Sequence, residues 1–183
     1  ASTGFARCTH AACDALAAAG HEVHVLGINY YGDPHQYPYT IWPCLQPLDG
    51  GHDPFGATRL PLLVYRLKPD VVVLLNDPWN VPEYLRRLKA VEGEDGGEAP
   101  ADYVIPPVVG WLAVDARNQH AKPLDALSAV AVWTRWAGEE LQRGGYGGEP
   151  VVMATLGADG APLRRHRRAP PASAPRRGAP RNR

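Results

Sequence analysis

The sequence has too few of certain residues to support several common kinds of protein. Its 183 residues include three cysteines, Cys8, Cys13 and Cys44, and no two of them form a Cys-x-x-Cys pair. A disulfide framework and a structural zinc site are therefore not expected, and neither is any other metal or cofactor. No apolar run approaches the roughly 20 residues that span a bilayer, and the start does not resemble a signal peptide. We expect a cytoplasmic protein with free thiols and no transmembrane segment.

Charges of both signs are present, but they are unevenly distributed. Residues 1–162 carry 19 acidic against 11 basic side chains, a balance of −8, whereas residues 163–183 hold eight arginines and no acid. The whole-chain net charge of zero therefore hides an acidic body and a basic tail. Because an acidic body repels nucleic acid, no specific nucleic-acid partner is expected.

The change in composition marks two segments. Residues 1–160 have the length of one ordinary domain, since domains most often run about 100 to 150 residues. Residues 161–183 are rich in Arg, Pro and Ala, cannot bury a core and are expected to be disordered. Two origins of this tail stay open: an out-of-frame translation of GC-rich DNA, which we favour, and a functional basic arm. Because the chain begins at Ala1 and Met153 is its single methionine, we expect a fragment of a longer protein.

The body alternates helix and strand signals. A first helix is predicted from a cap at Ser2 or Thr3 to Gly20, with an apolar face of Phe5, Cys8, Ala12, Leu16 and Ala19. Further helices are predicted after Asp53-Pro54 as far as Leu67, and over 81–88, 123–128 and 135–143. Strands are predicted over 21–28, 71–75, 107–114, 129–133 and 151–156, with one more within 40–45.

Strands separated by single helices imply parallel pairing with helices on both faces, so the fold class is α/β with a doubly wound, mostly parallel, Rossmann-like sheet. The unbroken apolar run 71–75 predicts a central strand covered on both faces. Such sheets bind ligands beyond the carboxyl ends of their strands, which here means the loops at 76–80, 115–122 and 134–136. The turn at 2–5 has no strand before it, so we expect the first strand to be missing.

Five short motifs share a resemblance to one enzyme family. They are Ser-Thr-Gly-Phe-Ala-Arg at 2–7, Gly-His-Glu-Val-His-Val-Leu-Gly at 20–27, Leu-Leu-Asn-Asp-Pro-Trp at 74–79, Val-Val-Gly-Trp-Leu-Ala-Val-Asp at 108–115 and Leu-Gly-Ala-Asp at 156–159. Together they make the chain resemble the N-terminal domain of a family 4 glycosyltransferase, one half of the two-domain GT-B fold. The resemblance covers about residues 2–159.

The resemblance implies a retaining enzyme that moves a sugar from a nucleotide-sugar donor to a carbohydrate or glycoconjugate acceptor, in the cleft between two domains. The half present here would hold the acceptor. The donor is held mainly by the C-terminal domain, which this sequence lacks, so the chain is expected to be inactive alone. The alternative that stays open is a non-catalytic Rossmann-like binding or interaction module.

The same resemblance assigns a substrate-binding role to the turn that opens the first helix, at Ser2, Thr3, Gly4 and Phe5. Free backbone N–H groups and the helix dipole favour an anionic or polyhydroxyl group there. The simpler interpretation is a capped helix. Thr134 likewise matches a small hydroxyl residue after a strand in the family, or caps the helix that follows.

Two more segments complete the candidate site. Asn76 and Asp77 follow a buried strand and are candidates for binding sugar hydroxyls, although both are also turn formers. Trp79 offers a ring that can stack on a sugar, although large rings are more often core. Asp115 is the candidate catalytic residue, since a carboxylate there can orient the acceptor hydroxyl or take its proton. A helix cap, or an ion pair with Arg117, accounts for Asp115 equally well.

Overall fold

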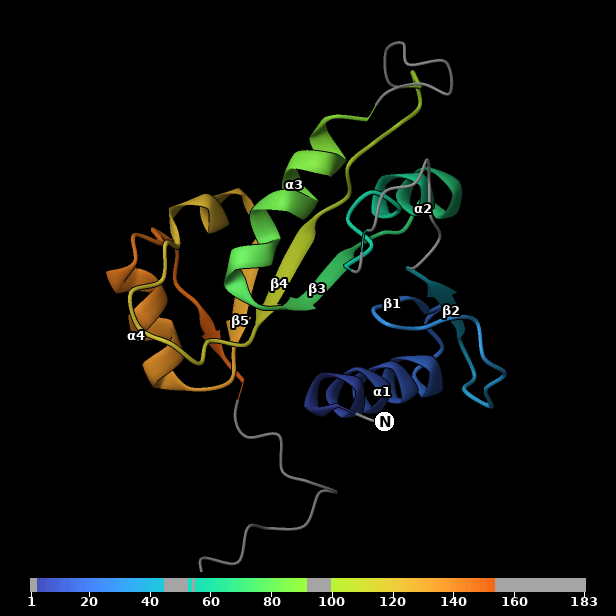
Figure 1. The fold of residues 1–183 in the computed structure, drawn as a ribbon, viewed down its shortest axis with the longest axis horizontal. Coiled ribbons are helices and arrows are strands. Elements are labelled where there is room, and N and C mark those ends of the chain that lie inside the picture. The colour runs from blue at the N-terminus through green and yellow to red at the C-terminus, as the bar shows by residue number, and fades with distance from the viewer. Residues whose placement is uncertain (1–2, 45–52, 54, 92–99, 154–183) are drawn as a thin grey trace, which may run out of the picture.

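The computed structural model describes residues 3–44, 53, 55–91 and 100–153. The helices are α1 (Gly4–Ala18), α2 (Leu60–Leu67), α3 (Val81–Lys89) and α4 (Arg135–Arg143), with short 3₁₀ helices η1 (Pro78–Asn80) and η2 (Lys122–Ala126). The strands are β1 (His24–Gly27), β2 (Thr40–Pro43), β3 (Val72–Asn76), β4 (Val108–Leu112), β5 (Ala129–Val132) and β6 (Val151–Val152). All of these strands pair in parallel, which confirms the α/β class (Figure 1). The predicted tail, and the end of the predicted strand 151–156, lie outside the described residues.

Local signals in the sequence account for the ends of several helices. α1 begins where the Thr3 hydroxyl accepts a hydrogen bond from the N–H of Ala6 (3.2 Å), and α4 begins where Thr134 does the same for Ala137 (3.1 Å). α2 ends at Lys68, which takes the left-handed conformation (φ 46°) before a proline. The starts of α1 and α4 agree with the predicted caps, and α2 ends at Leu67 as predicted. α2 begins at Leu60, however, and not directly after Asp53-Pro54.

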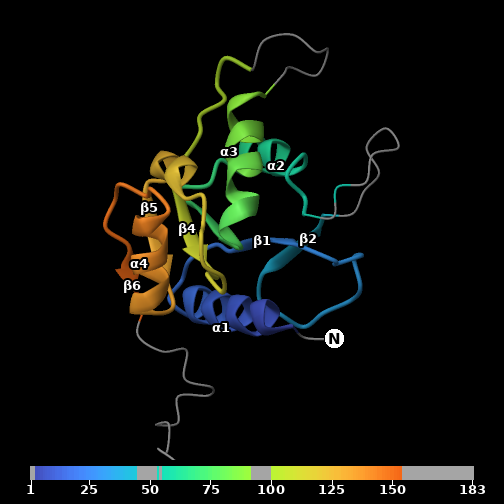
Figure 2. The same ribbon diagram turned by 60° about the vertical axis from the view of Figure 1, so that its left-hand side comes forward.

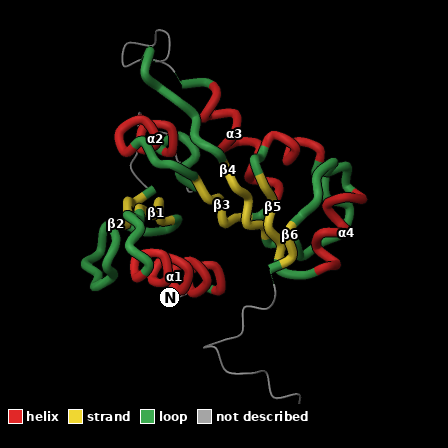
Figure 3. The backbone as a smooth tube through the Cα atoms, turned by 180° about the vertical axis from the view of Figure 1, so that it is seen from behind, coloured by secondary structure: helices red, strands yellow, loops and turns green. Residues whose placement is uncertain are grey.

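The strands form two sheets instead of the single sheet expected from the alternation. One has the order β1-β2, and the other has the order β3-β4-β5-β6. Figure 3 shows them as neighbours, with β1 lying between β2 and β3. The single sheet is therefore interrupted between β1 and β3, because no ladder of hydrogen bonds joins these two strands in the described chain.

The sheets lie between two layers of helices. α1 lies on one side of the strands, whereas α2 and α3 lie on the other (Figures 1 and 2). A loop from the end of β1 folds back on α1: the Tyr39 hydroxyl is 2.7 Å from Nδ1 of His10, and the ring of Tyr37 stacks on His10 at 4.0 Å. α1 is thereby fixed to the β1-β2 sheet, and it also touches β3.

The carboxyl ends of β1 and β2 are tied together. The N–H of Cys44 donates to the carbonyl oxygen of Gly27 (3.3 Å). Gly56 packs directly on this junction with φ +71°, where a Cβ would lie 2.8 Å from the Cβ of Cys44 and 2.9 Å from Leu26. Only glycine combines that backbone conformation with that close approach.

The same junction is tied to the carboxyl end of β3. The Tyr84 hydroxyl on α3 donates to the carbonyl oxygen of Phe55 (2.6 Å), and it accepts a hydrogen bond from the Asn76 amide (3.1 Å). Asn76 is the last residue of β3. The two sheets therefore present their carboxyl ends at one common edge, as a doubly wound fold requires.

The core lies on one face of the four-stranded sheet. Its buried side chains include Val72, Leu74, Val108, Leu112, Val130 and Val132, packed against residues of α2, α3 and α4. Side chains on the other face are more open, and Val73 in β3 and Val151 in β6 are 52% and 62% exposed. The prediction that 71–75 is covered on both faces is therefore wrong for the face that carries Val73.

Candidate functional site

The start of α1 lies beside the carboxyl end of β5. The ring centroids of Phe5 and Trp133 are 6.0 Å apart at an interplanar angle of 53°. Trp133 directly precedes Thr134. Two predicted parts of the site, the turn at 2–5 and the loop at 134–136, therefore lie side by side. Phe5 is half-buried in this contact. Ser2 lies outside the described residues.

The hydroxyl oxygens of Thr3 and Thr134 are both engaged in capping, as the simpler interpretation of each residue proposed. Gly4 differs from them, because a Cβ built on it would meet nothing within 4 Å. Glycine is therefore not required there by packing within the described chain. The open space beside the first turn of α1 is the feature of this segment that a ligand can use.

Asn76 is buried, with 7% of its surface exposed, and its side chain makes three hydrogen bonds within the described chain. Its oxygen accepts hydrogen bonds from the N–H of Asp77 (2.8 Å) and from the amide of Asn80 (2.9 Å), while its amide donates to Tyr84. Such a buried amide holds the turn after β3 in one conformation. Asn76 therefore positions its neighbours instead of presenting a group of its own.

Asp77 and Asp115 are brought close enough to affect each other. Burial raises the pKa of the Asp77 carboxyl, and the negative charge of Asp115 raises this pKa further. Asp77 is half-buried at the start of η1 and makes no capping hydrogen bond, while Asp115 is exposed. A higher pKa makes the Asp77 carboxylate a stronger base than an ordinary aspartate, so Asp77 joins Asp115 as a candidate proton acceptor.

Trp79 is placed as a platform at the same edge. Its side chain is 65% exposed, and its ring stands edge-on to Phe55 with centroids 5.7 Å apart and an interplanar angle of 89°. A large apolar ring with most of its surface in solvent is unusual for a core residue. The face of Trp79 is therefore available for stacking.

Two further indole N–H groups lack hydrogen-bond partners within the described residues. The nitrogens of Trp111 and Trp133 are buried, and neither makes a hydrogen bond within the described part of the chain. Buried donors are normally paired, so these two are exceptions within the described chain. Because neither nitrogen is accessible to solvent, neither can donate to a ligand in this conformation. No local sequence pattern reveals whether a buried indole N–H finds an acceptor.

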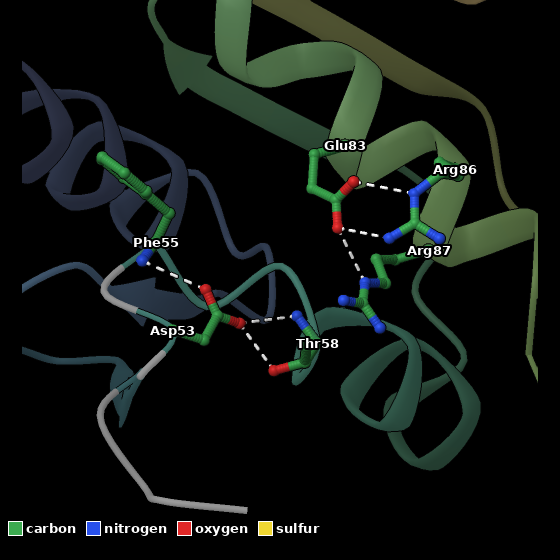
Figure 4. A network of polar contacts seen from close by, with 6 residues as sticks. All are labelled: Asp53, Phe55, Thr58, Glu83, Arg86 and Arg87. Atoms are coloured by element: carbon green, nitrogen blue, oxygen red, sulfur yellow. Dashed lines mark hydrogen bonds and ion pairs between the residues drawn. The ribbon is translucent and has the colours of Figure 1, made fainter. Parts of the chain in front are cut away.

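Asp53 is a further polar group near the site, and from the sequence it was predicted only to mark the start of a helix (Figure 4). Its carboxylate accepts from the N–H of Phe55 (3.3 Å) and from both the N–H and the hydroxyl of Thr58 (2.7 and 2.6 Å). Although burial favours the neutral acid, these bonds and one from the N–H of Ala57 outweigh it and lower the pKa of Asp53. Asp53 therefore fixes the loop that precedes α2.

Within the described residues, no group of three or more His, Cys, Asp or Glu side chains is arranged to hold a metal ion. None of the helices there has the length and apolar character needed to cross a membrane. A scan against protein-family models and a search of curated proteins found no match to this chain. Its function must therefore be inferred from the residues at the carboxyl edge.

Proposed function

We propose that this chain is the acceptor-side half of a family 4 glycosyltransferase of the GT-B fold, and that its carboxyl edge binds a carbohydrate or glycoconjugate acceptor. Transfer, with retention of configuration, requires a second domain that supplies the nucleotide-sugar donor. In this fold the first strand of the sheet belongs between β1 and β3. We also propose a cytoplasmic location, because the body is acidic and carries no disulfide framework.

The observation that carries the proposal is the pair of interacting carboxylates, Asp77 and Asp115, together with the exposed ring of Trp79 in the short helix η1 that Asp77 precedes. Carboxylates accept hydrogen bonds from sugar hydroxyls, and an aromatic ring covers the apolar face of a pyranose. In the full enzyme, Asp77 or Asp115 would orient the acceptor hydroxyl or take its proton.

A binding module without catalysis is the second candidate. It is favoured by Thr3, Asn76 and Thr134, whose side chains are engaged in hydrogen bonds within the chain. Both candidates allow a ligand at the carboxyl edge, but only the first requires that ligand to be a saccharide. Saccharide binding therefore separates them.

The test is a titration of the full chain with a panel of saccharides, in which tryptophan fluorescence reports binding. We expect Trp79→Ala and Asp77→Asn each to weaken binding about tenfold or more, as loss of one stacked or charged contact would. Tyr65→Leu, which removes a ring near the C-terminal end of α2, is the matched control and should leave the affinity unchanged. Failure of every saccharide to bind would leave the second candidate.

A donor assay tests the other half of the proposal. The full chain, mixed with nucleotide-sugar donors and any saccharide that binds, should give neither transfer nor donor hydrolysis. Clear turnover by the chain alone would contradict the requirement for a second domain.

A further inference from the structure

The loop between β1 and β2 is rich in rings. Residues 28–39 include four tyrosines and His35, and every residue from Tyr31 to Pro38 is exposed. In Figures 1 and 2 the loop extends beyond β2, away from the four-stranded sheet. It contributes none of the candidate residues described above, so its chemistry needs an explanation of its own.

One end of the loop is fixed on α1. The Tyr39 hydroxyl lies 2.7 Å from Nδ1 of His10, and Tyr39 is 6% exposed. The ring of Tyr37 stacks on the His10 ring, with centroids 4.0 Å apart and an interplanar angle of 9°. Because these contacts join a buried side chain to a helix, they hold Tyr37 in one orientation.

The other end of the loop is fixed close to β1. The N–H of Tyr30 donates to the carbonyl oxygen of Gly27 (3.2 Å), and the Tyr30 hydroxyl donates to the carbonyl oxygen of Asp33 (2.5 Å). Gly32 lies within this turn with φ +93°, a left-handed conformation that glycine adopts without strain. The turn at 30–33 is therefore closed on itself, and it leads directly into Pro34.

Ring contacts connect these two fixed ends. The rings of Tyr30 and His35 meet edge-on, with centroids 6.1 Å apart at 62°, and the rings of His35 and Tyr37 are tilted at 38° with centroids 5.6 Å apart. Rings that contact one another in this way limit the rotamers that each can adopt. The segment 34–37 is thus held in a defined shape although it lies in solvent.

This segment lines an open groove of about 590 Å³, whose walls are Pro34, His35, Gln36 and Tyr37. Small-molecule sites commonly have volumes of about 300–1,000 Å³. The side chains of His35, Gln36 and Tyr37 make no hydrogen bond to another residue in the described ranges. None of the four wall residues is an acid, a lysine or an arginine. The groove therefore offers ring faces and unused polar groups without a fixed charge.

These groups match the surface of a sugar. A pyranose has a C–H face that packs on an aromatic ring, and its rim carries hydroxyls that each donate and accept a hydrogen bond. The Gln36 amide, the neutral His35 imidazole and the Tyr37 hydroxyl likewise donate and accept. Hydroxyl groups can therefore pair with every polar group of the groove.

A proline-rich peptide is another ligand that aromatic grooves commonly bind. Its prolines have no N–H, so its backbone offers mainly carbonyl acceptors. Such a peptide would leave the acceptor atoms of His35 and Gln36 without donors, whereas hydroxyls would satisfy them. An anion fits less well than either ligand, because the exposed carboxylate of Asp33 belongs to the residue before Pro34.

We propose that this groove is a second carbohydrate-binding site, which takes one or two units of a neutral oligosaccharide. The ring of Tyr37 covers a sugar face, and the side chains of His35 and Gln36 bond to the hydroxyls at its rim. The site shares no residue with the carboxyl edge and does not require that the chain takes part in glycosyl transfer. Binding at the groove and at the carboxyl edge can therefore fail separately.

The experiment is an NMR titration of the isotopically labelled full chain with cellohexaose, maltohexaose and xylohexaose. We expect at least one of these neutral oligosaccharides to shift the amide signals of residues 35–37 and the ring signals of Tyr37 along one saturable curve. Asp77→Asn, a variant of the carboxyl edge, should show the same shifts with unchanged affinity.

Two variants remove different groups from the groove. Gln36→Ala removes an amide that has no hydrogen-bond partner among the described residues, so it should weaken binding about two- to tenfold without affecting the fold. Tyr37→Leu removes the stacking ring and should weaken binding by a similar factor. Tyr31→Ala is the matched control, because Tyr31 is 70% exposed on the same loop but does not line the groove. Its affinity should be unchanged.

Four results would overturn the proposal. If none of the three oligosaccharides shifted the signals of residues 35–37, the groove would not be a carbohydrate site. If Tyr31→Ala weakened binding as much as Gln36→Ala, the sugar would contact the loop without using the groove. If a peptide of ten prolines bound these residues more tightly than every oligosaccharide, the groove would be a peptide site. Shifts confined to residues 76–80 would also overturn it, while they would support the proposed function.

Discussion

The part built from α1, β1 and β2 and the part built from β3–β6 with α2–α4 follow the same alternation of helix and strand, yet they bury their apolar side chains to different extents. In the first part, Cys13 is the single buried residue of α1, and β1 has none. In the second, Leu88, Leu112, Leu124, Leu141, Val81, Val130 and Val132 are fully buried. The second part therefore carries the core, and the first depends on a few specific contacts with it.

The largest expected effect tests this difference directly. Leu112→Ala removes a fully buried side chain from β4 and should lower the free energy of unfolding by about 2–5 kcal/mol, because the cavity cannot be refilled. Leu16→Ala on α1 should lower it by less than about 1 kcal/mol, since that side chain is already half in solvent. Urea denaturation of both variants measures the two values. Equal losses would mean that the two parts share one core.

Gly56 is the next most sensitive position, because it joins the two parts. Gly56→Ala should cost about 2–3 kcal/mol, since φ is +71° and the new Cβ would lie 2.8 Å from that of Cys44. Gly4→Ala, at an open position in the first turn of α1, is the matched control and should be neutral or slightly stabilising. Thermal unfolding measures both variants. If Gly56→Ala lost no more stability than Gly4→Ala, the close contact of Gly56 with Cys44 and Leu26 would not be important for stability.

Asn76 tests the hydrogen bonds at the common edge. Asn76→Ala leaves the Asn80 amide and the N–H of Asp77 without their acceptor, which should cost about 1–2 kcal/mol. Gln142→Ala removes an amide from an exposed site and should have almost no effect. Asn76→Ala should also weaken the binding of any saccharide near Asp77, although Asn76 itself does not face the ligand. If urea denaturation showed no loss of stability for Asn76→Ala, these hydrogen bonds would not hold the turn after β3.

Local patterns were enough to predict most elements and caps. Thr3 and Thr134 cap helices as predicted, and most of the apolar run 71–75 lies in the parallel strand β3 (Val72–Asn76). The division of the strands into two sheets between β1 and β3 could not be predicted from local patterns, because strand pairing joins residues that are distant in sequence. The exposure of Val73 was also missed, since a run of apolar residues reads the same whether one face or both are covered.

The candidate site was predictable at the level of segments but not of individual roles. The rule that ligands bind at the carboxyl ends of strands selected the segments that contain Asp77 and Asp115, and the structure brings these two carboxylates close enough to interact. Residue type alone did not distinguish Asn76, whose amide is consumed internally, from Asp77, whose carboxyl is left without a cap bond. Direction and burial of a side chain depend on contacts such as that with Tyr84, which is eight residues away on another element.

The smallest expected effect compares two carboxylates shown in Figure 4. Glu83 pairs with Arg86 (2.6 Å) and Arg87 (2.8 Å) on the surface of α3, and these cations lower its pKa to about 2. Asp53 is half-buried and bound by N–H and hydroxyl groups, which lower its pKa below the ordinary 3.8. Because both pKa values are lowered on folding, each group stabilises the protein above its unfolded pKa and loses that contribution as the pH falls through its folded pKa.

Salt should separate the two contributions. Glu83→Gln should cost at most about 0.5 kcal/mol at neutral pH, and the loss should vanish in 1 M salt, because exposed ion pairs are screened. Asp53→Asn should cost about 1 kcal/mol in either salt, because its hydrogen bonds involve no cationic partner. Urea denaturation at low and high salt measures both losses. If the loss of stability on Asp53→Asn also disappeared in 1 M salt, Asp53 would act through long-range charge. The hydrogen bonds from Phe55 and Thr58 to Asp53 would then not be what holds the loop before α2, or what positions Phe55 to bond with Tyr84.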